Sequence, residues 1–262
     1  MAEDCIPASN IRPVSDDLPV DVDFVRNTFL FGVNLKDDDG NPLPDSVIEF
    51  YIESATRWLE RALSINILPV SVKNESHDYY YTDYEQYSFV RLLHYPVRAV
   101  CKVAMRFPLT TEVLAFDPSW YRTESVAGQV NLIPTQGSFS AILMGQGGSF
   151  LPMVYSGKDY VPHIIHVDYE AGFPDGQIPA DILNLIGMKA AIGPLNIAGD
   201  LIAGAGIANK SISLDGLSES IGTTSSATNA GYGARILQYE KQIKDDLALV
   251  RRNFKGIEFV VA

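Results

Sequence analysis

The stretch that decides the fold is Leu92-Leu93-His94-Tyr95-Pro96-Val97-Arg98-Ala99-Val100-Cys101-Lys102-Val103. Side chains of a strand alternate between its two faces, and apolar residues recur at every second position from Val97 onward. The pattern predicts an apolar face that holds Val97, Ala99, Cys101, Val103 and Met105. The other face would meet water or an acidic neighbour, and it would hold Arg98, Val100, Lys102, Ala104 and Arg106.

Upstream of this strand, the sequence from Pro44 to about Ile65 has the period of an amphipathic helix. Pro44 suits a first-turn position, and Ser46 with Glu49 matches a capping box. Pro69 would end the helix at the latest. The expected buried face follows a spacing of three and four residues: Ile48, Tyr51, Ile52, Ala55, Trp58, Leu59, Ala62 and Leu63.

Downstream, further strands are predicted at residues 77–83, 87–93, 129–133 and 161–169. A second helix is predicted from Ile178 to about Ala191, because Gly193-Pro194 would break or kink it. Alternation around Asp215-Gly216 favours a hairpin, and a third helix is expected from about Gly233 to Asn253.

This order of elements predicts an α+β fold with a helical body and an inserted antiparallel β-rich domain. The expected organisation is a flexible acidic arm (1–27), a helical body (28–76 and 176–253), a β-rich insertion (77–175) and a C-terminal tail (254–262). The arm is expected to order only against a partner, because it is rich in Pro and Asp and shows no sustained period.

Charge is unevenly distributed along a chain whose formal net charge is −12. Residues 1–60 hold thirteen acidic and four basic side chains, whereas residues 235–255 hold six basic and three acidic ones. Copies of such a chain, or partners of opposite charge, could stack end to end, although solubility alone would also explain the surplus. Strong binding to free nucleic acid is not expected, because phosphate affinity requires clustered Lys and Arg.

Two cysteines, Cys5 and Cys101, do not suggest a disulfide framework, and a reducing compartment is the simple inference. The start Met1-Ala2-Glu3-Asp4 is acidic and shows no signal peptide. From Ile182 to Ala208 only Lys189 and Asp200 are charged. We expect a buried helix or a subunit contact there and no membrane span, because Gly193-Pro194 interrupts the stretch.

The sequence contains partial matches to metal-binding and phosphate-binding motifs, but none of them is complete. The run Asp37-Asp38-Asp39 places Gly40 too early for a calcium loop, so a solvated turn is expected. His163, His166 and Asp168 would supply only two ligands on one strand face. The stretch 204–211 approximates a phosphate-binding loop, but Asn209 stands where its second Gly should be. No catalytic residue, metal or cofactor is therefore predicted, and the chain is not expected to be an enzyme.

Three pieces of the chain, in their order, resemble the head–tail connector (adaptor or neck) proteins of tailed bacteriophages. The first is an apolar run and an acidic turn before the Pro44 helix, which carries Arg57-Trp58-Leu59-Glu60 in its second half. The second is the strand pair from Leu92 to Val103, and the third is Val167-Asp168-Tyr169-Glu170-Ala171-Gly172-Phe173 followed by Ile178-Pro179-Ala180-Asp181-Ile182. The resemblance implies a helical connector-type body and a structural role in the virion. A head-to-tail adaptor would form a ring, a dodecamer by this resemblance, under the portal, and double-stranded DNA would pass through it without sequence-specific binding.

The resemblance further implies three protein partners: the portal ring, a stopper or other neck protein on the tail side, and other copies of this chain. Assembly would take place in the host cytoplasm and would end in the virion neck. Interface candidates are the apolar tail, the basic end of the last helix and the acidic turn: Ile257, Phe259, Val260, Val261, Arg251, Arg252, Lys255, Asp37, Asp38 and Asp39.

Three alternatives stay open. Within the neck, a stopper or tail-completion protein is the nearest rival to an adaptor. A carbohydrate- or envelope-binding β module would need an exposed aromatic face, and the candidates for it are Tyr79, Tyr81, Tyr84 and Trp120. A hydrolase that uses scattered carboxylates is the third alternative.

Overall fold

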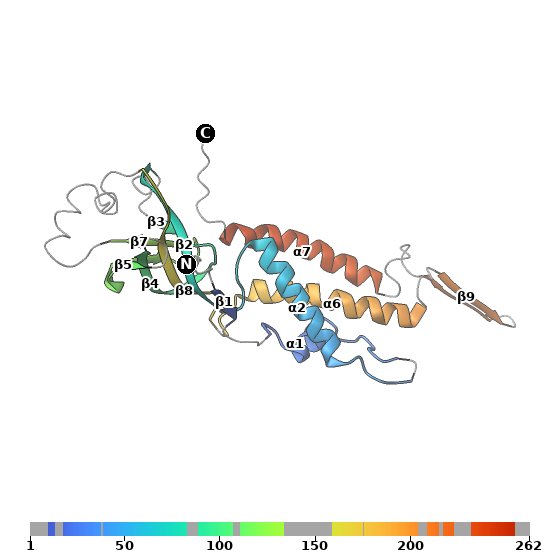
Figure 1. The fold of residues 1–262 in the computed structure, drawn as a ribbon. Coiled ribbons are helices and arrows are strands. Elements are labelled where there is room, and N and C mark those ends of the chain that lie inside the picture. The colour runs from blue at the N-terminus through green and yellow to red at the C-terminus, as the bar shows by residue number, and fades with distance from the viewer. Residues whose placement is uncertain are drawn as a thin grey trace, which may run out of the picture. The chain divides into compact units, whose positions relative to one another are not determined.

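The structure, a computed structural model, divides the chain into two compact units that enclose different cores (Figure 1). The helical unit combines Asp17–Ser64 with Ile178–Asn253, and the β unit comprises Met1–Asp16, Ile65–Gln177 and Phe254–Ala262. The fold is therefore mixed α+β, as expected. The structure describes residues 10–13, 18–37, 39–82, 89–106, 111–133, 159–174, 176–203, 209–214, 217–222 and 232–254.

The β unit contains two antiparallel sheets. The first has the strand order β1-β2-β8-β4-β5 and is built from β1 (Asn10–Pro13), β2 (Val70–Tyr80), β4 (Val97–Arg106), β5 (Glu112–Ala115) and β8 (Tyr160–Ala171). The second has the order β3-β7-β6 and is built from β3 (Phe89–Arg91), β6 (Tyr121–Glu124) and β7 (Gln129–Leu132). A short 3-10 helix, η1 (Pro118–Trp120), precedes β6.

One hydrophobic core joins the two sheets of the β unit. Val103, Val167 and Tyr169 come from the five-stranded sheet, and Val130 and Leu132 come from the three-stranded sheet. All five side chains are at most 2% exposed. Neither sheet could bury an apolar face alone, so the two sheets stabilise each other as one unit.

The β unit begins earlier than residue 77, where the sequence pattern placed it. β2 already starts at Val70, and its first half includes the polar run from Lys73 to Ser76. Asn, Glu and Lys are depleted in strands, so this half of β2 has little β signal in the sequence. Pairing with β8 along its length holds it in the sheet.

β4 forms as predicted, but the predicted alternation of its two faces is wrong. The register with β8 shifts between Val97 and Ala99 and again between Val100 and Lys102, so β4 carries an extra residue at each point. Each bulge resets the alternation of side chains. As a result, Cys101 is exposed rather than on the apolar face, whereas Val103, Ala104 and Met105 are all buried.

The helical unit contains four helices and one hairpin among its described residues. The helices are α1 (Val22–Thr28), α2 (Asp45–Leu63), α6 (Ala180–Ala203) and α7 (Gly233–Phe254). The hairpin pairs β9 (Asn209–Leu214) with β10 (Leu217–Gly222), which confirms the predicted strand pairing; Asp215 and Gly216, where its turn was predicted, lie outside the described residues.

The sequence predicted a flexible arm over residues 1–27, but part of this segment forms regular structure. β1 pairs with β2, and α1 begins after Asp21, whose Oδ1 accepts a hydrogen bond from Phe24 N at 2.6 Å. This N-cap satisfies one of the free amides of the first turn. Val25 of α1 is completely buried, so the helix is anchored by the core of its unit.

α2 follows its predicted bounds closely but is not capped as predicted. Its N-cap is Pro44, which offers no side-chain acceptor, and Ser46 lies inside the helix. The capping box of Ser46 and Glu49 is therefore wrong. The helix ends at Ser64, whose φ of 57° places it in the left-handed region that commonly terminates helices.

α6 is continuous, and the break predicted at Gly193-Pro194 is wrong. Pro194 lies inside the helix, where it costs one backbone hydrogen bond. Burial on both sides of it offsets this loss, because Ala190, Ala191 and Leu195 are fully buried. Within the described part of the chain, Ala180–Leu201 is long and apolar enough to cross a membrane, yet 67% of its most apolar window is buried inside the protein.

Candidate functional site

The acidic turn before α2 is closed by hydrogen bonds between its own residues. The Asp37 carboxylate accepts hydrogen bonds from Asn41 N at 2.7 Å, from Asn41 Nδ2 at 3.0 Å and from Asp39 N at 3.1 Å. The side-chain hydrogen bond from Asn41 is the main reason that the pKa of Asp37 lies below its ordinary value. This carboxylate holds the turn together, and no group of three metal-ligating side chains occurs among the residues that the structure describes.

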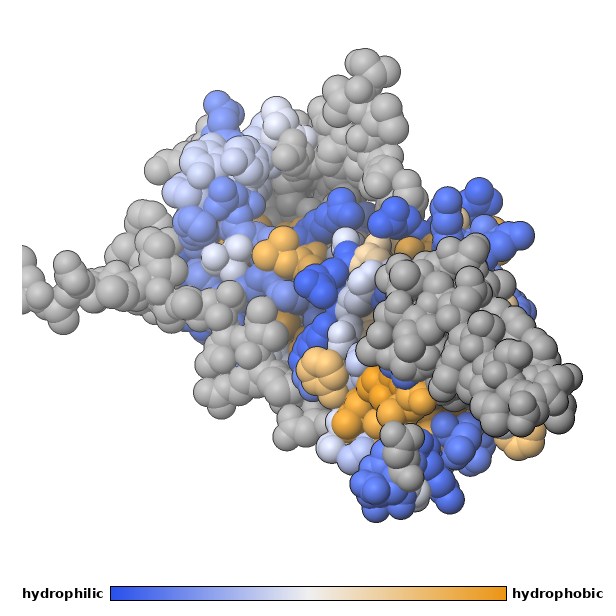
Figure 2. Space-filling model, turned by 90° about the vertical axis from the view of Figure 1, so that its right-hand side faces the viewer, coloured by the Kyte–Doolittle hydropathy of each residue, from blue (hydrophilic) through white to orange (hydrophobic). Residues whose placement is uncertain are grey.

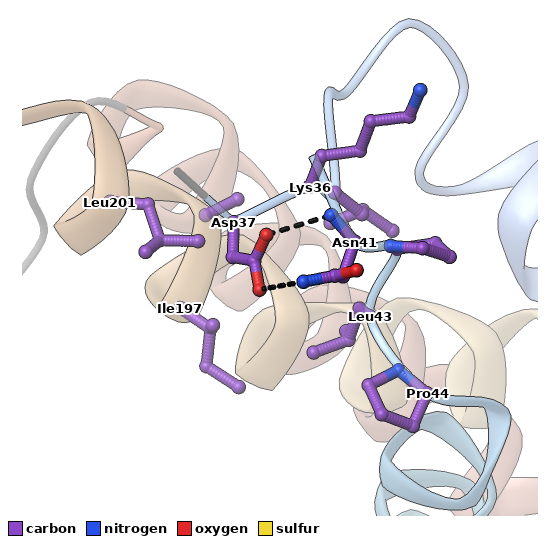
Figure 3. A pocket seen from close by; sticks show the side chains of 10 residues that line it. Lys36, Asp37, Asn41, Leu43, Pro44, Ile197 and Leu201 are labelled. Atoms are coloured by element: carbon purple, nitrogen blue, oxygen red, sulfur yellow. Dashed lines mark hydrogen bonds between the residues drawn. The ribbon is translucent and has the colours of Figure 1, made fainter. Parts of the chain in front are cut away.

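An apolar pocket lies between this turn and the C-terminal part of α6 (Figure 3). It has a volume of about 260 Å³. Leu43, Ile197 and Leu201 project into it, while Lys36 and Asp37 provide charge at its rim. An apolar cavity of about 150 Å³ can already bind benzene, so this pocket has room for a large apolar side chain. Its mostly apolar lining suits the binding of an apolar group.

Figure 2 shows apolar surface gathered on one face of the molecule, bordered by hydrophilic side chains. Among the residues that line the pocket, Leu201 is 44% exposed. Isolated exposed apolar residues are normal, but grouped ones at a pocket commonly mark an interaction site. The pocket and its surroundings therefore form a candidate contact surface.

The outer side of α2 combines an exposed aromatic ring with negative charge. Phe50 is 63% exposed, and Glu49 and Glu53, one turn apart, are exposed beside it. The opposite side of the helix is buried through Ile48, Ile52, Ala55, Thr56, Leu59 and Leu63. We call Glu49, Phe50 and Glu53 the acidic α2 face.

The outer side of α7 has the opposite charge. Leu237, Lys241, Lys244 and Ala248 follow one another at intervals of four, three and four residues, so they share one side of the helix, and all are exposed. The buried side holds Ile236, Tyr239, Ile243 and Val250. Leu237 is 54% exposed. We call Leu237, Lys241 and Lys244 the basic α7 face.

Hydrogen bonds fasten α7 at both ends within the helical unit. Near its start, Tyr239 Oη donates to Phe29 O at 2.9 Å. Near its end, Arg251 Nη2 donates to Ala62 O at 2.7 Å, close to the C-terminus of α2. Arg251 is thus partly engaged within its own chain, whereas Arg252 is exposed on the same helix. α7 is therefore held so that one side stays outward.

The structure describes only some of the predicted interface residues. Asp37 and Asp39 lie in the closed turn, and Arg251 and Arg252 lie at the end of α7. Asp38, Lys255 and the tail residues Ile257, Phe259, Val260 and Val261 lie outside the described residues. The sequence reasoning missed Phe50 and Leu237, although their apolar character at outward helical positions was a readable signal.

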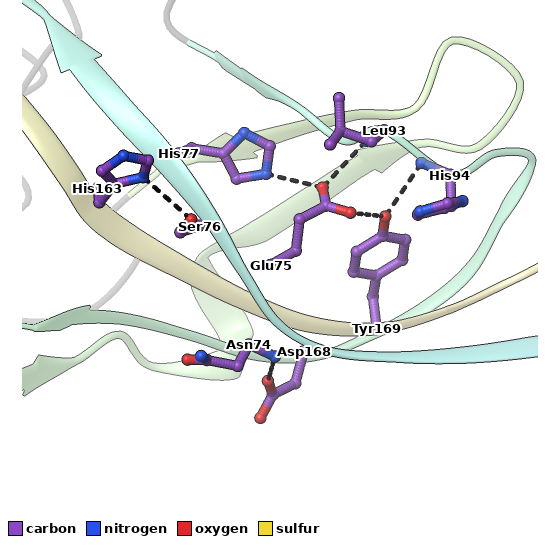
Figure 4. A network of polar contacts seen from close by, with 9 residues as sticks. All are labelled: Asn74, Glu75, Ser76, His77, Leu93, His94, His163, Asp168 and Tyr169. Atoms are coloured by element: carbon purple, nitrogen blue, oxygen red, sulfur yellow. Dashed lines mark hydrogen bonds and ion pairs between the residues drawn. The ribbon is translucent and has the colours of Figure 1, made fainter. Parts of the chain in front are cut away.

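The β unit holds a buried polar cluster around Glu75 (Figure 4). The carboxylate accepts hydrogen bonds from Tyr169 Oη at 2.6 Å and from Leu93 N at 3.0 Å, and His77 Nε2 lies 2.8 Å away. Burial alone would raise the pKa of Glu75, but hydrogen bonds from His77, Tyr169 and Leu93 together lower it. The same burial, with the carboxylate beside it, strongly raises the pKa of Tyr169.

This cluster holds a loop in place. Tyr169 Oη also accepts a hydrogen bond from His94 N at 3.1 Å, and His94 Nδ1 lies 3.1 Å from Asn66 Oδ1. Through Leu93 and His94, the carboxylate and the phenol fix the connection between β3 and β4 against the sheet. An ionised carboxylate with three hydrogen-bond partners is satisfied as a structural group.

A second cluster brings together Ser76, Asp78 and His163, a residue set that catalyses hydrolysis in other proteins. Ser76 Oγ lies 3.2 Å from His163 Nδ1, and Asp78 Oδ1 lies 3.8 Å from the same nitrogen. A catalytic relay needs the hydroxyl and the carboxylate on different ring nitrogens. Asp78 Oδ1 instead accepts from His163 N at 2.8 Å and so stabilises a residue whose φ is 49°. The arrangement supports a bulge in β8.

The metal-ligand candidates on β8, His166 and Asp168, each contact backbone atoms instead. His166 is buried, and its Nε2 lies 2.9 Å from His163 O. Asp168 Oδ1 accepts a hydrogen bond from Asn74 N at 2.6 Å, at the bulge of β2. Asp168 and Asp78 thus play the same part, each stabilising a left-handed residue on the facing strand.

The aromatic residues proposed for a carbohydrate-binding face do not share an exposed surface. Tyr79 is 1% exposed, and Tyr81 and Trp120 pack against the core of the β unit. Tyr84 lies outside the described residues. Tyr80 and Tyr160 are exposed in the β unit, but their rings contact each other, with centroids 4.8 Å apart and planes tilted by 35°.

Comparisons with solved structures find chains of gene transfer agent particles among the structural neighbours. A chain from the virion of a native gene transfer agent particle aligns with a TM-score of 0.47 and 11% identity, covering 96% of this chain and 98% of that chain. A chain from the neck of an empty particle of this kind aligns with a TM-score of 0.38 and 13% identity, covering 70% of this chain and 82% of that chain. No family model and no curated protein matches the sequence.

Proposed function

We propose that this chain is a structural protein of a phage-like virion, and that it acts as a head-to-tail adaptor in the neck. Copies of it form a ring under the portal, which links capsid and tail and lets DNA pass. The observation that carries the proposal is the chain's organisation. Two sequence segments, Asp17–Ser64 and Ile178–Asn253, build one helical unit, and most of the β unit, Ile65–Gln177, lies between them in the sequence. The three pieces that resemble the connector family follow this same order.

The surfaces of the helical unit support an assembly role. An apolar pocket, the acidic α2 face and the basic α7 face all belong to this unit. Exposed apolar side chains flanked by charge are typical of surfaces that bind other proteins. The helical unit would therefore provide the contacts of the ring.

The chain's charge suits a channel through which DNA slides. A net charge of −12 disfavours tight binding of the phosphate backbone. Transient passage requires weak contacts, so an acidic chain is compatible with this task. The β unit, with its own core, would be an added domain that contacts neighbouring neck components.

A structural role also agrees with the two polar clusters. Glu75 and Tyr169 fix a loop, and Asp78 and Asp168 stabilise bulges. Each of these groups has its hydrogen bonds directed at the protein's own backbone or side chains. We therefore propose no enzymatic activity for the chain.

Disruption of the gene in its parent particle tests the proposal. We expect DNA-filled heads and free tails that fail to join, and we expect joining to return when the purified chain is added to the mixture. Fully joined, infectious or transducing particles without this chain would refute the proposal. A matched control is the variant Glu124→Gln, which changes an exposed residue of β6 and should restore joining as well as the natural chain does.

A further inference from the structure

We infer that the basic α7 face of one copy docks on the acidic α2 face of a second copy. The inference deepens the proposed function and rests on it, because it names the surfaces through which the ring would form. Each face combines one large apolar side chain with two charges of the same sign. On α2 they are Glu49, Phe50 and Glu53, and on α7 they are Leu237, Lys241 and Lys244. Exposed charges of the other sign border them: Glu240 and Asp245 on α7, and Arg57 on α2.

Charge complementarity is the first argument for this pairing. Glu49 and Glu53 are four residues apart, and Lys241 and Lys244 are three apart, so each pair lies on one side of its helix and spans about one turn. Two helices laid against each other can then match two carboxylates with two ammonium groups. Opposite potentials of this kind steer association and fix its register.

The second argument is that these charges have no ion-pair partner inside the described chain. The ion pairs of the helical unit are Arg26–Asp45 and Arg57–Glu60, and neither uses the four charges of the two faces. Exposed charges are usually solvated, but an exposed ring and an exposed Leu beside them are less easily explained by solubility. At 63% and 54% exposure, Phe50 and Leu237 leave apolar area that a second copy would cover.

The pairing has a consequence for symmetry. The two faces lie on different helices, so one copy can offer its basic α7 face to one neighbour and its acidic α2 face to another, which is a heterologous contact. Heterologous contacts produce rings where the rotation closes, and filaments where it does not. A ring is the closed arrangement that the proposed function requires, whereas two copies that exchange both faces with each other would form a two-fold dimer.

Charge reversal of the purified full-length chain tests this inference, with self-association measured by sedimentation in low salt. The acidic variant carries Lys241→Glu and Lys244→Glu, and the basic variant carries Glu49→Lys and Glu53→Lys. Each variant alone places like charges in every contact, so we expect its self-association to weaken at least tenfold. A one-to-one mixture of the two variants restores contacts between opposite charges. We expect the mixture to associate more strongly than either variant alone.

A control with the same change of charge as the acidic variant carries Lys73→Glu and Arg91→Glu, two exposed positions of the β unit. It should associate like the natural chain, and circular dichroism should show that every variant is folded. The inference is overturned if the natural chain stays monomeric, if the separate variants associate normally, or if the mixture does not recover. The sedimentation experiment tests only the docking of purified copies. It can exclude this docking while the chain is still found on the virion, and it can support the docking even if the chain is absent from the virion.

Discussion

Replacing Glu75 by Gln changes one atom of a buried group and should destabilise the β unit. The carboxylate accepts hydrogen bonds from Tyr169 Oη and Leu93 N and also contacts His77. Gln keeps one oxygen and turns the other into a donor. Whichever way the amide is turned, one of the present donors loses its acceptor.

The size of the effect follows from these contacts. A hydrogen bond to a charged group contributes about 1.5–3 kcal/mol, and an unsatisfied buried donor costs about 1–3 kcal/mol. We therefore expect Glu75→Gln to reduce the free energy of unfolding of the β unit by about 2–4 kcal/mol. Glu75→Ala removes every acceptor and should cost at least as much.

The pH dependence of the same variant has a definite sign. The pKa of Glu75 is lowered in the folded protein, so the ionised carboxylate contributes stability above its unfolded pKa of about 4.3. That contribution is lost as the pH falls through the lower, folded pKa. The natural β unit should therefore lose stability upon acidification in this range, and Glu75→Gln should lack this part of the loss.

Urea unfolding measures both effects. The chain has two tryptophans, Trp58 in the helical unit and Trp120 in the β unit, so a Trp58→Phe background leaves Trp120 fluorescence to report on the β unit. Glu124→Gln, at an exposed position of β6, is the control and should keep the natural midpoint. An unchanged midpoint for Glu75→Gln, or an unchanged acid dependence, would refute the assigned role of the cluster.

Three further predictions address other features. Gly187→Ala places a methyl group against the buried ring of Phe29 and should destabilise the helical unit by about 1–3 kcal/mol in thermal unfolding, and the added change Phe29→Leu should recover part of this loss. Burial, followed by the charges of Glu170 and Asp168, raises the pKa of the Cys101 thiol, so in a chain with Cys5→Ser its alkylation rate should reach its midpoint above the ordinary pH of about 8.5. Glu170→Gln should lower that midpoint, and an unchanged midpoint would show that the charge of Glu170 does not raise the pKa of the thiol. Deleting residues 255–262 should leave both units folded in circular dichroism but weaken attachment to purified portals, and full occupancy by the truncated chain would count against this prediction.

The long periodic elements could be predicted from the sequence because burial alone dictates them. α2 and α7 each show one apolar side in the sequence, and both helices form within two residues of the predicted bounds. The hairpin at Asp215-Gly216 has local turn chemistry and was equally readable. Such elements need no knowledge of the rest of the fold.

The errors arose where tertiary contacts override local patterns. Pro194 is tolerated because apolar neighbours bury α6 on both sides of it. The two bulges of β4 depend on its pairing with β8, which no local pattern encodes, and they turn Cys101 outward. The cluster of Glu75 with Tyr169 joins residues 94 positions apart, so it could not be inferred from spacing. Phe50 and Leu237, by contrast, were visible as apolar residues on the outer sides of their helices.

Imaging of purified particles tests whether this chain occupies the neck of a virion-like particle, as proposed. A small label fused to the chain should appear in electron micrographs as several copies around the axis at the portal vertex, between head and tail. Purified particles that contain no copy, or that carry the label only at other sites, would contradict the proposal.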